Sequence, residues 1–291
     1  MVKELESNDG KSLITIINNN YNSMSKGQKL LAKYTLDNYP KVAFMTASKL
    51  GETVGVSEST VVRFANALGY TGYPKFQDAL QELIKTKLTT VERVEMSNTE
   101  YPSDSIILEK VLKDDIDNIK ETMETLSQVD YQEAVNLVMS ARKVYIMGLR
   151  SSIYVAKYLG YYLNYILDDV RIIRMDMGEP IEQMIKLSEE DLLISISFPR
   201  YSKKTLQVVK FAKERGAKVL AITDSYNAPI SKISDVVVTV KNNMVSFIDS
   251  LVPAFSVANA LVIGVAMREK DDIKAYFKEL ESIWEKFETF E

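Results

Sequence analysis

Five short apolar runs, each followed by a segment of helical character, constrain the fold of this chain more than any other feature. They lie at residues 144–147, 170–174, 192–196, 218–222 and 235–240. Strands that alternate with helices in this way form parallel sheets that are covered on both faces. The third run is apolar almost throughout, as a central strand should be. We therefore predict an α/β domain in which helices enclose a parallel sheet.

The first 88 residues show a different pattern, which predicts four or five helices and no strands. One amphipathic helix over residues 25–39 is expected to end at Pro40, because proline disrupts a helix interior. Residues 47–69 then predict two short helices around a tight turn. Gly55 ends the first of them in a left-handed C-terminal conformation, and Ser57 caps the second. Three apolar residues of the second helix recur at helical spacing and should face inward: Val61, Phe64 and Leu68.

This arrangement is typical of a helix-turn-helix, whose second helix presents short polar side chains to the major groove. A helical hairpin on the protein surface is the alternative for this stretch alone. The residues that we expect to reach bases or phosphates are Ser57, Ser59, Thr60 and Arg63. Tyr73 and Lys75, on the following turn, are expected to contact the DNA backbone. The partner predicted for this segment is double-stranded operator DNA.

The charge balance supports a division of the chain into a DNA-binding domain, a linker and a second domain. Residues 1–88 contain 11 Lys+Arg and 8 Asp+Glu, whereas the remainder contains 25 and 32. A slightly basic head on an acidic body is consistent with nucleic-acid binding by the head alone. We place the linker at residues 89–105, which are mostly polar, and the second domain at residues 106–291.

The chain contains neither cysteine nor histidine. This excludes thiol catalysis, Ser-His-Asp triads and histidine metal sites. We expect no catalytic residues, no cofactor and no metal centre. The uncharged residues 250–267 are long enough to be considered as a membrane span, but they contain Pro253, Ser256 and Asn259. We expect them to form a buried helix of a cytoplasmic protein that does not contact a membrane.

Two loops in the second domain are suited to binding an anion. Residues 148–152 follow the first predicted strand and residues 197–202 follow the third, and each loop leads directly into a helix. Ligands of open parallel sheets bind beyond the carboxyl ends of the strands, where helix N-termini favour anions. The candidate ligand-binding residues are Arg150, Ser151, Ser152, Ser197, Arg200 and Ser202. The alternative is that the serines simply cap the two helices.

These residues also resemble a known family. The run from Gly55 to Phe64, with Leu68-Gly-Tyr70 and Tyr73-Pro-Lys-Phe76, resembles the helix-turn-helix domain of the RpiR (MurR/RpiR) family of bacterial regulators. The second domain is similar to the sugar isomerase (SIS) domain of that family, a five-stranded parallel sheet between helix layers. The resemblance covers about residues 10–270. It implies a transcriptional regulator that senses a phosphorylated sugar.

The resemblance is incomplete at the phosphate loop. Ser152 matches the serine of the first loop, and Ser197 and Ser202 match the first and last hydroxyl residues of the family's Ser-x-Ser-Gly-x-Ser/Thr pattern. Pro199 and Arg200 replace its middle serine and its glycine, and Arg150 stands where the first loop often has a second glycine. Our hypothesis is that the two arginines compensate, so that the ligand is held more by charge.

Two other functions remain open from the sequence. The SIS-like domain of a regulator could serve only for dimerisation, since helix-turn-helix proteins commonly bind DNA as dimers. We expect a homodimer or a higher homo-oligomer in either case. The chain could instead be a sugar-phosphate isomerase, but that reaction needs a placed base and acid. Glu179 is a lone acid near the second strand, where a helix cap or a solvated side chain is the usual role.

Overall fold

The computed structural model describes residues 13–87, 89–94, 104–243 and 248–290. They fall into two compact units, one within residues 1–99 and one within residues 100–291. Most of the predicted linker, at residues 95–103, lies outside the described residues. Residues 90–94, which belong to its described part, are helical.

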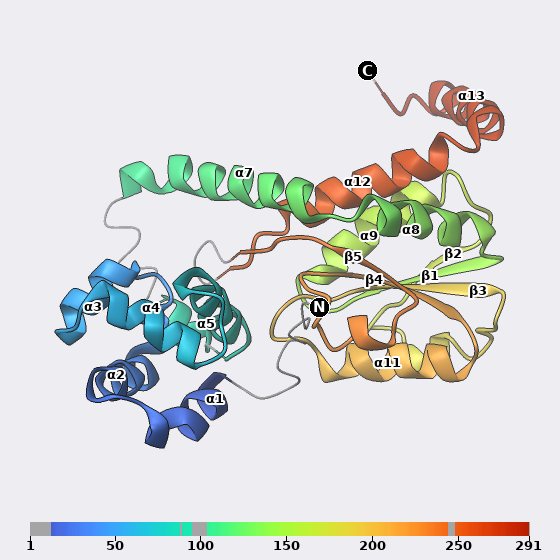
Figure 1. Cartoon of the computed structure of the whole chain (residues 1–291). Coiled ribbons are helices and arrows are strands. Elements are labelled where there is room, and N and C mark those ends of the chain that lie inside the picture. The colour runs from blue at the N-terminus through green and yellow to red at the C-terminus, as the bar shows by residue number, and fades with distance from the viewer. Residues whose placement is uncertain (1–12, 88, 95–103, 244–247, 291) are drawn as a thin grey trace. The chain divides into compact units, whose positions relative to one another are not determined.

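Helices make up the described part of the first unit, in agreement with the sequence pattern (Figure 1). They are α1 (Leu13–Asn20), α2 (Lys26–Val42), α3 (Ala47–Val54), α4 (Glu58–Ala67) and α5 (Tyr73–Lys87), with a 3₁₀ turn at Tyr21–Ser23. The prediction that Pro40 ends α2 was wrong. Asn38 leaves helical geometry at φ −136°, which kinks the helix, and the chain then continues as helix through Pro40 to Val42. The kink lies just before the proline, where the ring would otherwise clash with the preceding turn.

The core of this unit is formed where α2, α3, α4 and α5 meet. Phe64 of α4 packs edge-to-face on Phe76 of α5 with ring centroids 5.5 Å apart. The fully buried apolar side chains around this pair include Leu31, Leu50, Val61 and Leu80. Burial of such side chains contributes about 1.5–3 kcal/mol each, so the helices are held together chiefly by this cluster.

The predicted turn between α3 and α4 is confirmed. Gly55 has φ +78°, and its N–H donates to the carbonyl of Gly51 at 2.9 Å. Ser57 caps α4, since its hydroxyl accepts from the N–H of Thr60 at 3.3 Å. Gly51 is required by close packing, because a Cβ there would lie 2.8 Å from the carbonyl oxygen of Val56. The backbone of the turn and of the first residue of α4, Glu58, makes this approach.

Three side chains of α5 tie it to the segment that leads into α3. The Tyr73 hydroxyl and the Gln77 amide both donate to the carbonyl of Met45, at 2.8 and 3.0 Å. The amides of Gln77 and Gln81 donate to the carbonyl of Ala43 at 3.0 and 3.1 Å. These bonds satisfy carbonyl groups that no helix ladder serves, and they fix the entry to the helix-turn-helix against α5.

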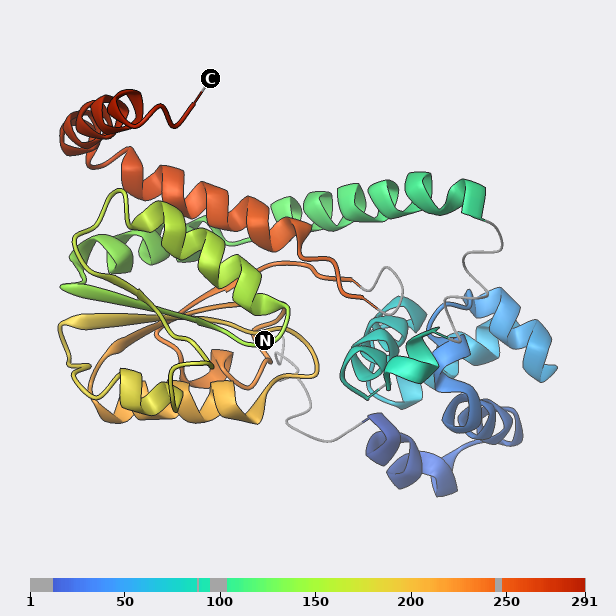
Figure 2. The same cartoon turned by 180° about the vertical axis from the view of Figure 1, so that it is seen from behind.

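The second unit contains the predicted five-stranded parallel sheet (Figures 1 and 2). The strands are β1 (Lys143–Gly148), β2 (Val170–Ile172), β3 (Asp191–Ile196), β4 (Lys218–Thr223) and β5 (Val236–Thr239). Their order is β2-β1-β3-β4-β5, and all four pairings are parallel. The central position is taken by β3, whose residues are buried throughout, as the sequence predicted.

Helices cover both faces of this sheet. The helices over one face are α8 (Gln128–Ser140), α9 (Ser152–Leu163) and α12 (Val252–Ala266), with α7 (Ile107–Thr125) packed against α12. The other face packs on α10 (Pro180–Gln183), α11 (Lys203–Glu214) and the 3₁₀ turn Ser231–Ile233. A further 3₁₀ turn, Asp104–Ile106, precedes α7. The last helix, α13 (Lys270–Lys286), contacts the segment that follows α9, where Tyr165 packs on Phe277 with ring centroids 5.7 Å apart.

Residues 252–266 of the uncharged run form α12, which buries one side in this layer, whereas Ser256, Asn259 and Ile263 on its other side are exposed. Its inward residues include Ala254, Ala258, Leu261 and Val265, which belong to the core above the sheet. Among the helices of the described residues, none combines the length and the apolar character needed to cross a membrane.

Replacement of Gly51 by alanine should destabilise the helix-turn-helix by roughly 1–3 kcal/mol, because the new methyl group would press on the Val56 carbonyl. Hydrogen-exchange mass spectrometry of the full-length protein would detect this as faster exchange in peptides that contain α3 and α4. Lys49→Ala is the matched control, since Lys49 is exposed on the same helix and its replacement should change stability by no more than about 0.5 kcal/mol. Equal exchange in the two variants would contradict the close approach.

Candidate nucleic-acid interface and anion site

The N-terminal half of α4 presents a small network of polar side chains. The hydroxyl of Ser57 lies 2.9 Å from the hydroxyls of both Ser59 and Thr60. The guanidinium of Arg63 donates to the Thr60 hydroxyl at 3.3 Å. Ser57, Ser59 and Arg63 are exposed, and Thr60 is half-buried. The structure therefore brings together the four residues predicted from α4, and it orients their donors and acceptors toward the surface.

A hollow of about 530 Å³ beside α4 adds residues that sequence reasoning missed. Ser25, Gly27 and Gln28 of the α2 N-terminus line it together with residues of α4. Ser25 and Gln28 form a capping box, in which the Ser25 N–H donates to Gln28 Oε1 at 2.9 Å. The Gln28 amide also donates to the carbonyl of Arg63 at 3.4 Å, which links the two helices. The Ser-x-x-Gln spacing at the start of an amphipathic helix was the available signal.

The structure corrects the expectation for Tyr73, which is only 4% exposed. Its hydroxyl is bound to the Met45 carbonyl, and burial raises the pKa of Tyr73 to about 12. A side chain used in this way inside the core is unavailable to a DNA backbone. Lys75 is exposed on α5, where its amine pairs with Asp78 at 3.0 Å. Exposed pairs of this kind are weak, so the ammonium group can exchange its partner for a phosphate.

In the second unit, the two predicted anion-binding loops lie next to each other. Gly148 at the end of β1 is paired with Ile196 at the end of β3, so the loops begin at the same edge of the sheet. The helices that follow them lie on opposite faces, α9 on one and α11 on the other. The boundary between β1 and β3 is therefore the point where the strand order reverses, which is the usual place for a ligand in an open α/β sheet.

Both arginines of these loops have a strained backbone. Arg150 has φ +57° and Arg200 has φ +61°, in the left-handed region that favours glycine. Such a conformation costs a non-glycine residue about 1–2 kcal/mol. Both side chains are exposed. Strained residues that persist in this way cluster at functional sites, and two of the three non-glycine residues with positive φ in the described chain lie in the predicted anion-binding loops, the third being Glu288.

The serines of the loops differ in their environment. Ser151 and Ser202 occupy the N-cap positions of α9 and α11, but neither side chain makes a capping hydrogen bond. Ser152 and Ser197 are buried, and the Ser197 N–H is bound to the Ile222 carbonyl at 3.1 Å. Capping alone therefore does not account for Ser151 and Ser202, and the Ser197 amide is used by the sheet and not offered to a ligand.

Two residues at the same edge escaped the sequence reasoning. Asp224 directly follows β4 and is buried, and its Oδ1 accepts a hydrogen bond from the Tyr201 hydroxyl at 2.8 Å. Tyr201 belongs to the loop after β3, so this bond connects two neighbouring strand ends. The signal was present in the sequence, since an acid that follows a buried strand of a parallel sheet lies at its ligand-binding edge.

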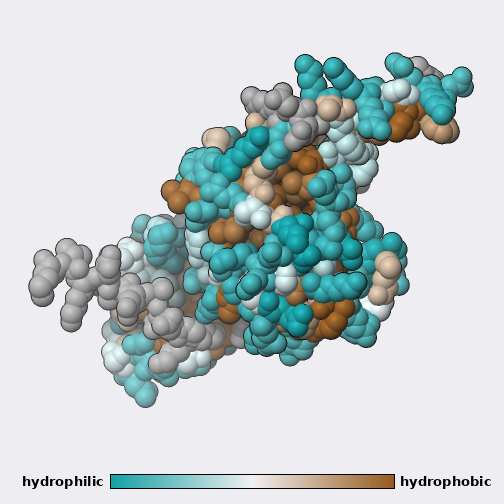
Figure 3. Space-filling model, turned by 90° about the vertical axis from the view of Figure 1, so that its right-hand side faces the viewer, coloured by the Kyte–Doolittle hydropathy of each residue, from teal (hydrophilic) through white to brown (hydrophobic). Residues whose placement is uncertain are grey.

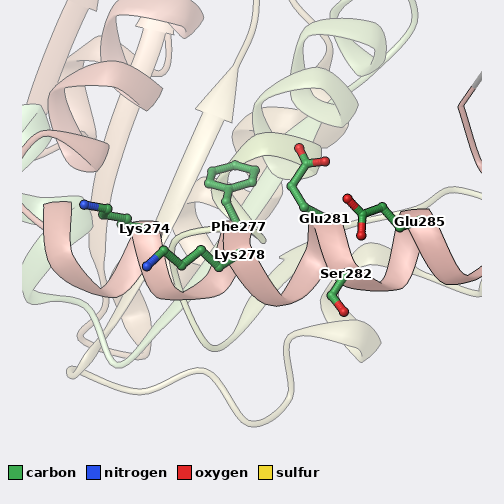
Figure 4. Close-up of a pocket in the computed structure, with 6 residues that line it drawn as sticks. All are labelled: Lys274, Phe277, Lys278, Glu281, Ser282 and Glu285. Carbon is green, nitrogen blue, oxygen red and sulfur yellow. The ribbon is translucent and has the colours of Figure 1, made fainter.

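Glu179, the lone acid considered for catalysis, has a structural role. It precedes α10, its N–H donates to the Glu182 carboxylate at 3.1 Å, and its own carboxylate pairs with Lys204 at 2.7 Å. Within the part of the chain that the structure describes, no group of three or more acidic side chains is arranged to hold a metal ion. A hollow of about 420 Å³ beside α13 is lined on one side only, by the α13 residues drawn in Figure 4, and the side chains there do not converge on a common point.

Comparisons with known proteins agree with this geometry. Residues 11–87 match the helix-turn-helix domain of the rpiR family, and residues 137–264 match the SIS domain. The HTH-type transcriptional regulator HexR of Pseudomonas aeruginosa is 23% identical over 93% of this chain and 94% of its own length. An uncharacterized HTH-type transcriptional regulator of Escherichia coli, YfhH, is 29% identical over 71% of this chain and 73% of its own.

Two solved structures have the same fold. The sugar isomerase domain of an RpiR transcription factor from Sphaerobacter thermophilus covers 61% of this chain and 99% of its own, with a TM-score of 0.58 and 27% identity. The Vibrio vulnificus NanR protein complexed with ManNAc-6P covers 94% of this chain and 98% of its own, with a TM-score of 0.58 and 20% identity. With the helix-turn-helix of α3 and α4 followed by a five-stranded parallel sheet, this chain belongs to the RpiR family of transcriptional regulators that carry an SIS domain.

Proposed function

We propose that the protein binds operator DNA through α4 and that its SIS domain binds a phosphorylated sugar, which alters operator binding. The observation that carries the sugar half is the pair of loops at the boundary of β1 and β3, each with an arginine in left-handed geometry. The relative from Vibrio vulnificus was solved with ManNAc-6P, which is a phosphorylated sugar. A regulator of this kind works where the DNA is, in the cytoplasm.

For the DNA half, the exposed network on α4 provides donors of the types that read bases. An arginine that reaches the major groove binds guanine through two hydrogen bonds, and serine or threonine hydroxyls can form hydrogen bonds with several of the bases. Arg63 and Ser59 are exposed on the half of α4 that a helix-turn-helix directs at the DNA. We assign base contacts to these two residues, with Ser57 and Thr60 orienting them, and a phosphate contact to Lys75.

Arg63→Ala should weaken operator binding by about 1–3 kcal/mol, because a good bidentate contact to a base contributes that much to discrimination. The operator can be selected from a random DNA library by the wild-type protein, and affinities can be measured by fluorescence anisotropy at a fixed salt concentration. Lys75→Ala is the matched control: loss of a phosphate contact should weaken binding equally for all sequences. Unchanged selectivity in Arg63→Ala would remove Arg63 from the interface.

For the sugar half, the two arginines and the N-termini of α9 and α11 together favour a doubly charged phosphate group. Charge-assisted hydrogen bonds from guanidinium groups are stronger than those between neutral groups. Helix N-termini add partial positive charge, and the Ser151 and Ser202 hydroxyls make no capping bond to their helices. Pro199 offers no backbone donor, so the arginines take over part of the role that amides have in other phosphate loops.

Arg150→Gly and Arg200→Gly should each weaken the binding of a hexose 6-phosphate about tenfold or more, through loss of a charge-assisted bond. Calorimetry on the full-length protein measures this. Arg150→Ala is the control for backbone strain. Because glycine adopts φ +57° without strain, the Arg150→Gly protein should be about 1 kcal/mol more stable than the Arg150→Ala protein. Both variants should lose affinity for the hexose 6-phosphate. Wild-type affinity in both glycine variants would refute the hypothesis that the arginines hold the ligand.

The proposal includes a homodimer, for which α7 is the supporting element. Figure 3 shows hydrophobic patches on one face of the molecule, separated by hydrophilic surface. On α7, a stripe of large apolar side chains is exposed at spacings of three and four residues, with Leu108 72% and Met123 75% exposed. The other members of the stripe are Leu112, Ile116 and Ile119. A stripe of this kind is normally covered in the working protein by a second helix.

Leu112→Glu combined with Ile116→Glu should therefore dissociate the dimer and weaken operator binding, since two half-sites would no longer be held by one particle. Sedimentation velocity gives the mass of the particle. Lys113→Glu, on α7 but off the stripe, is the control and should leave the dimer intact. A wild-type protein that sediments as a monomer at micromolar concentration would contradict this part of the proposal.

The two other functions lead to different observations. A domain that only dimerises would show no thermal shift with any sugar phosphate, and an isomerase would turn one over. The named relatives are transcriptional regulators, and Glu179 is committed to a helix cap and an ion pair. These observations favour a binding role over catalysis.

A further inference from the structure

A buried carboxylate at the edge of the sheet has no part in the function proposed above. Asp224 is 8% exposed, and its Oδ1 accepts hydrogen bonds from the Tyr201 hydroxyl at 2.8 Å and from the Thr223 hydroxyl at 3.2 Å. Its second oxygen, Oδ2, is buried and has no hydrogen-bond partner among the residues that the structure describes. A carboxylate withdrawn from water is costly unless all its oxygens find donors. Oδ2 is thus a buried acceptor for which the described residues provide no donor.

The sheet places this oxygen beside the anion-binding loops. Ile196 and Ile222 are paired at the ends of β3 and β4, and the Ser197 N–H is bound to the Ile222 carbonyl. Asp224 follows two residues later, at the edge where the loop 197–202 begins. The hydrogen bond from Tyr201 joins Asp224 to the middle of that loop, between Arg200 and Ser202. The carboxylate of Asp224 is therefore bonded to the residue that directly follows Arg200 in this loop.

The chemistry of this site is divided into two parts. Arg150 and Arg200 offer positive charge, which suits a phosphate group. Asp224 offers a negatively charged acceptor that Tyr201 and Thr223 hold in one orientation, which suits a hydroxyl or an ammonium group. A ligand that satisfies both parts has a phosphate at one end and a hydrogen-bond donor at the other. A ligand that places a carboxylate of its own near Asp224 would instead be repelled, because both groups are negatively charged.

We propose that Asp224 is an effector-binding residue that accepts a hydrogen bond from a hydroxyl or ammonium group of the sugar. It selects phosphate esters of neutral sugars and amino sugars, and it rejects phosphorylated sugar acids. Tyr201 is a positioning residue, which acts on the ligand through Asp224. This inference rests on the proposed phosphosugar site and extends it by naming the class of ligand.

Calorimetry on the full-length protein tests this with four probes: inorganic phosphate, glucose 6-phosphate, glucosamine 6-phosphate and 6-phosphogluconate. For the wild type, at least one of the two hexose phosphates should bind at least tenfold more tightly than inorganic phosphate, and 6-phosphogluconate should not. Asp224→Asn keeps the volume of the side chain and an acceptor for Tyr201, but it removes the negative charge. It should weaken hexose phosphate binding at least tenfold and leave inorganic phosphate binding unchanged.

The outcomes separate this inference from the proposed function. Asp224→Asn with wild-type affinity for the hexose phosphates would overturn it, as would an equal loss for inorganic phosphate, which would mark a purely structural role. Tight binding of 6-phosphogluconate by the wild type would also overturn it. A wild type that binds none of the sugar phosphates would refute the proposed function and this inference together. If Asp224→Asn does not fold, Tyr201→Phe provides a second variant. It should also lose affinity for the hexose phosphates and keep its affinity for inorganic phosphate.

Discussion

The parallel pairing of β1 with β3 is the interaction on which the rest of the second unit depends. It sets Gly148 beside Ile196, and because the following helices leave toward opposite faces, it opens the edge between them to a ligand. The register of β3 with β4 then brings Asp224 to the same edge. Residues separated by more than 70 positions in the chain thus lie at one edge of the sheet, and a slip of one residue in either pairing would move them apart.

Much of this architecture follows from local patterns that can be read in the sequence. Short apolar runs predicted every strand, and the complete burial of β3 matches its apolar run Leu192–Ile194, although Asp191 and Ser195 of the same strand are buried with it. Gly55 and Ser57 predicted the turn of the helix-turn-helix, because each residue type satisfies one conformational need there. The failures have a different origin. Proline alone predicted a helix end at Pro40, whereas the helix is kinked at Asn38 and continues through the proline to Val42.

The sites were predicted less completely, since their partners come from distant parts of the chain. Arg150 and Arg200 were predicted as ligand-binding residues from the position of their loops. Their left-handed backbone conformation could not be predicted from the sequence. Tyr73 was misjudged because a tyrosine after a turn gives no sign of whether its ring is buried. The place of Asp224 directly after a buried strand could have been read from the sequence, but its oxygen without a hydrogen-bond partner could not. Gln28 was missed for a similar reason, since its bond to the Arg63 carbonyl spans two helices.

The bonds from α5 to the segment before α3 have a mechanical consequence. Tyr73, Gln77 and Gln81 bind the carbonyls of Ala43 and Met45, and Phe76 from the same helix packs on Phe64 of α4. The helix-turn-helix is therefore braced at its entry, before α3, and in its core, through α4. A signal from the second unit cannot easily reshape α4 without breaking this bracing. The helices of the helix-turn-helix are thus expected to move together as one rigid block.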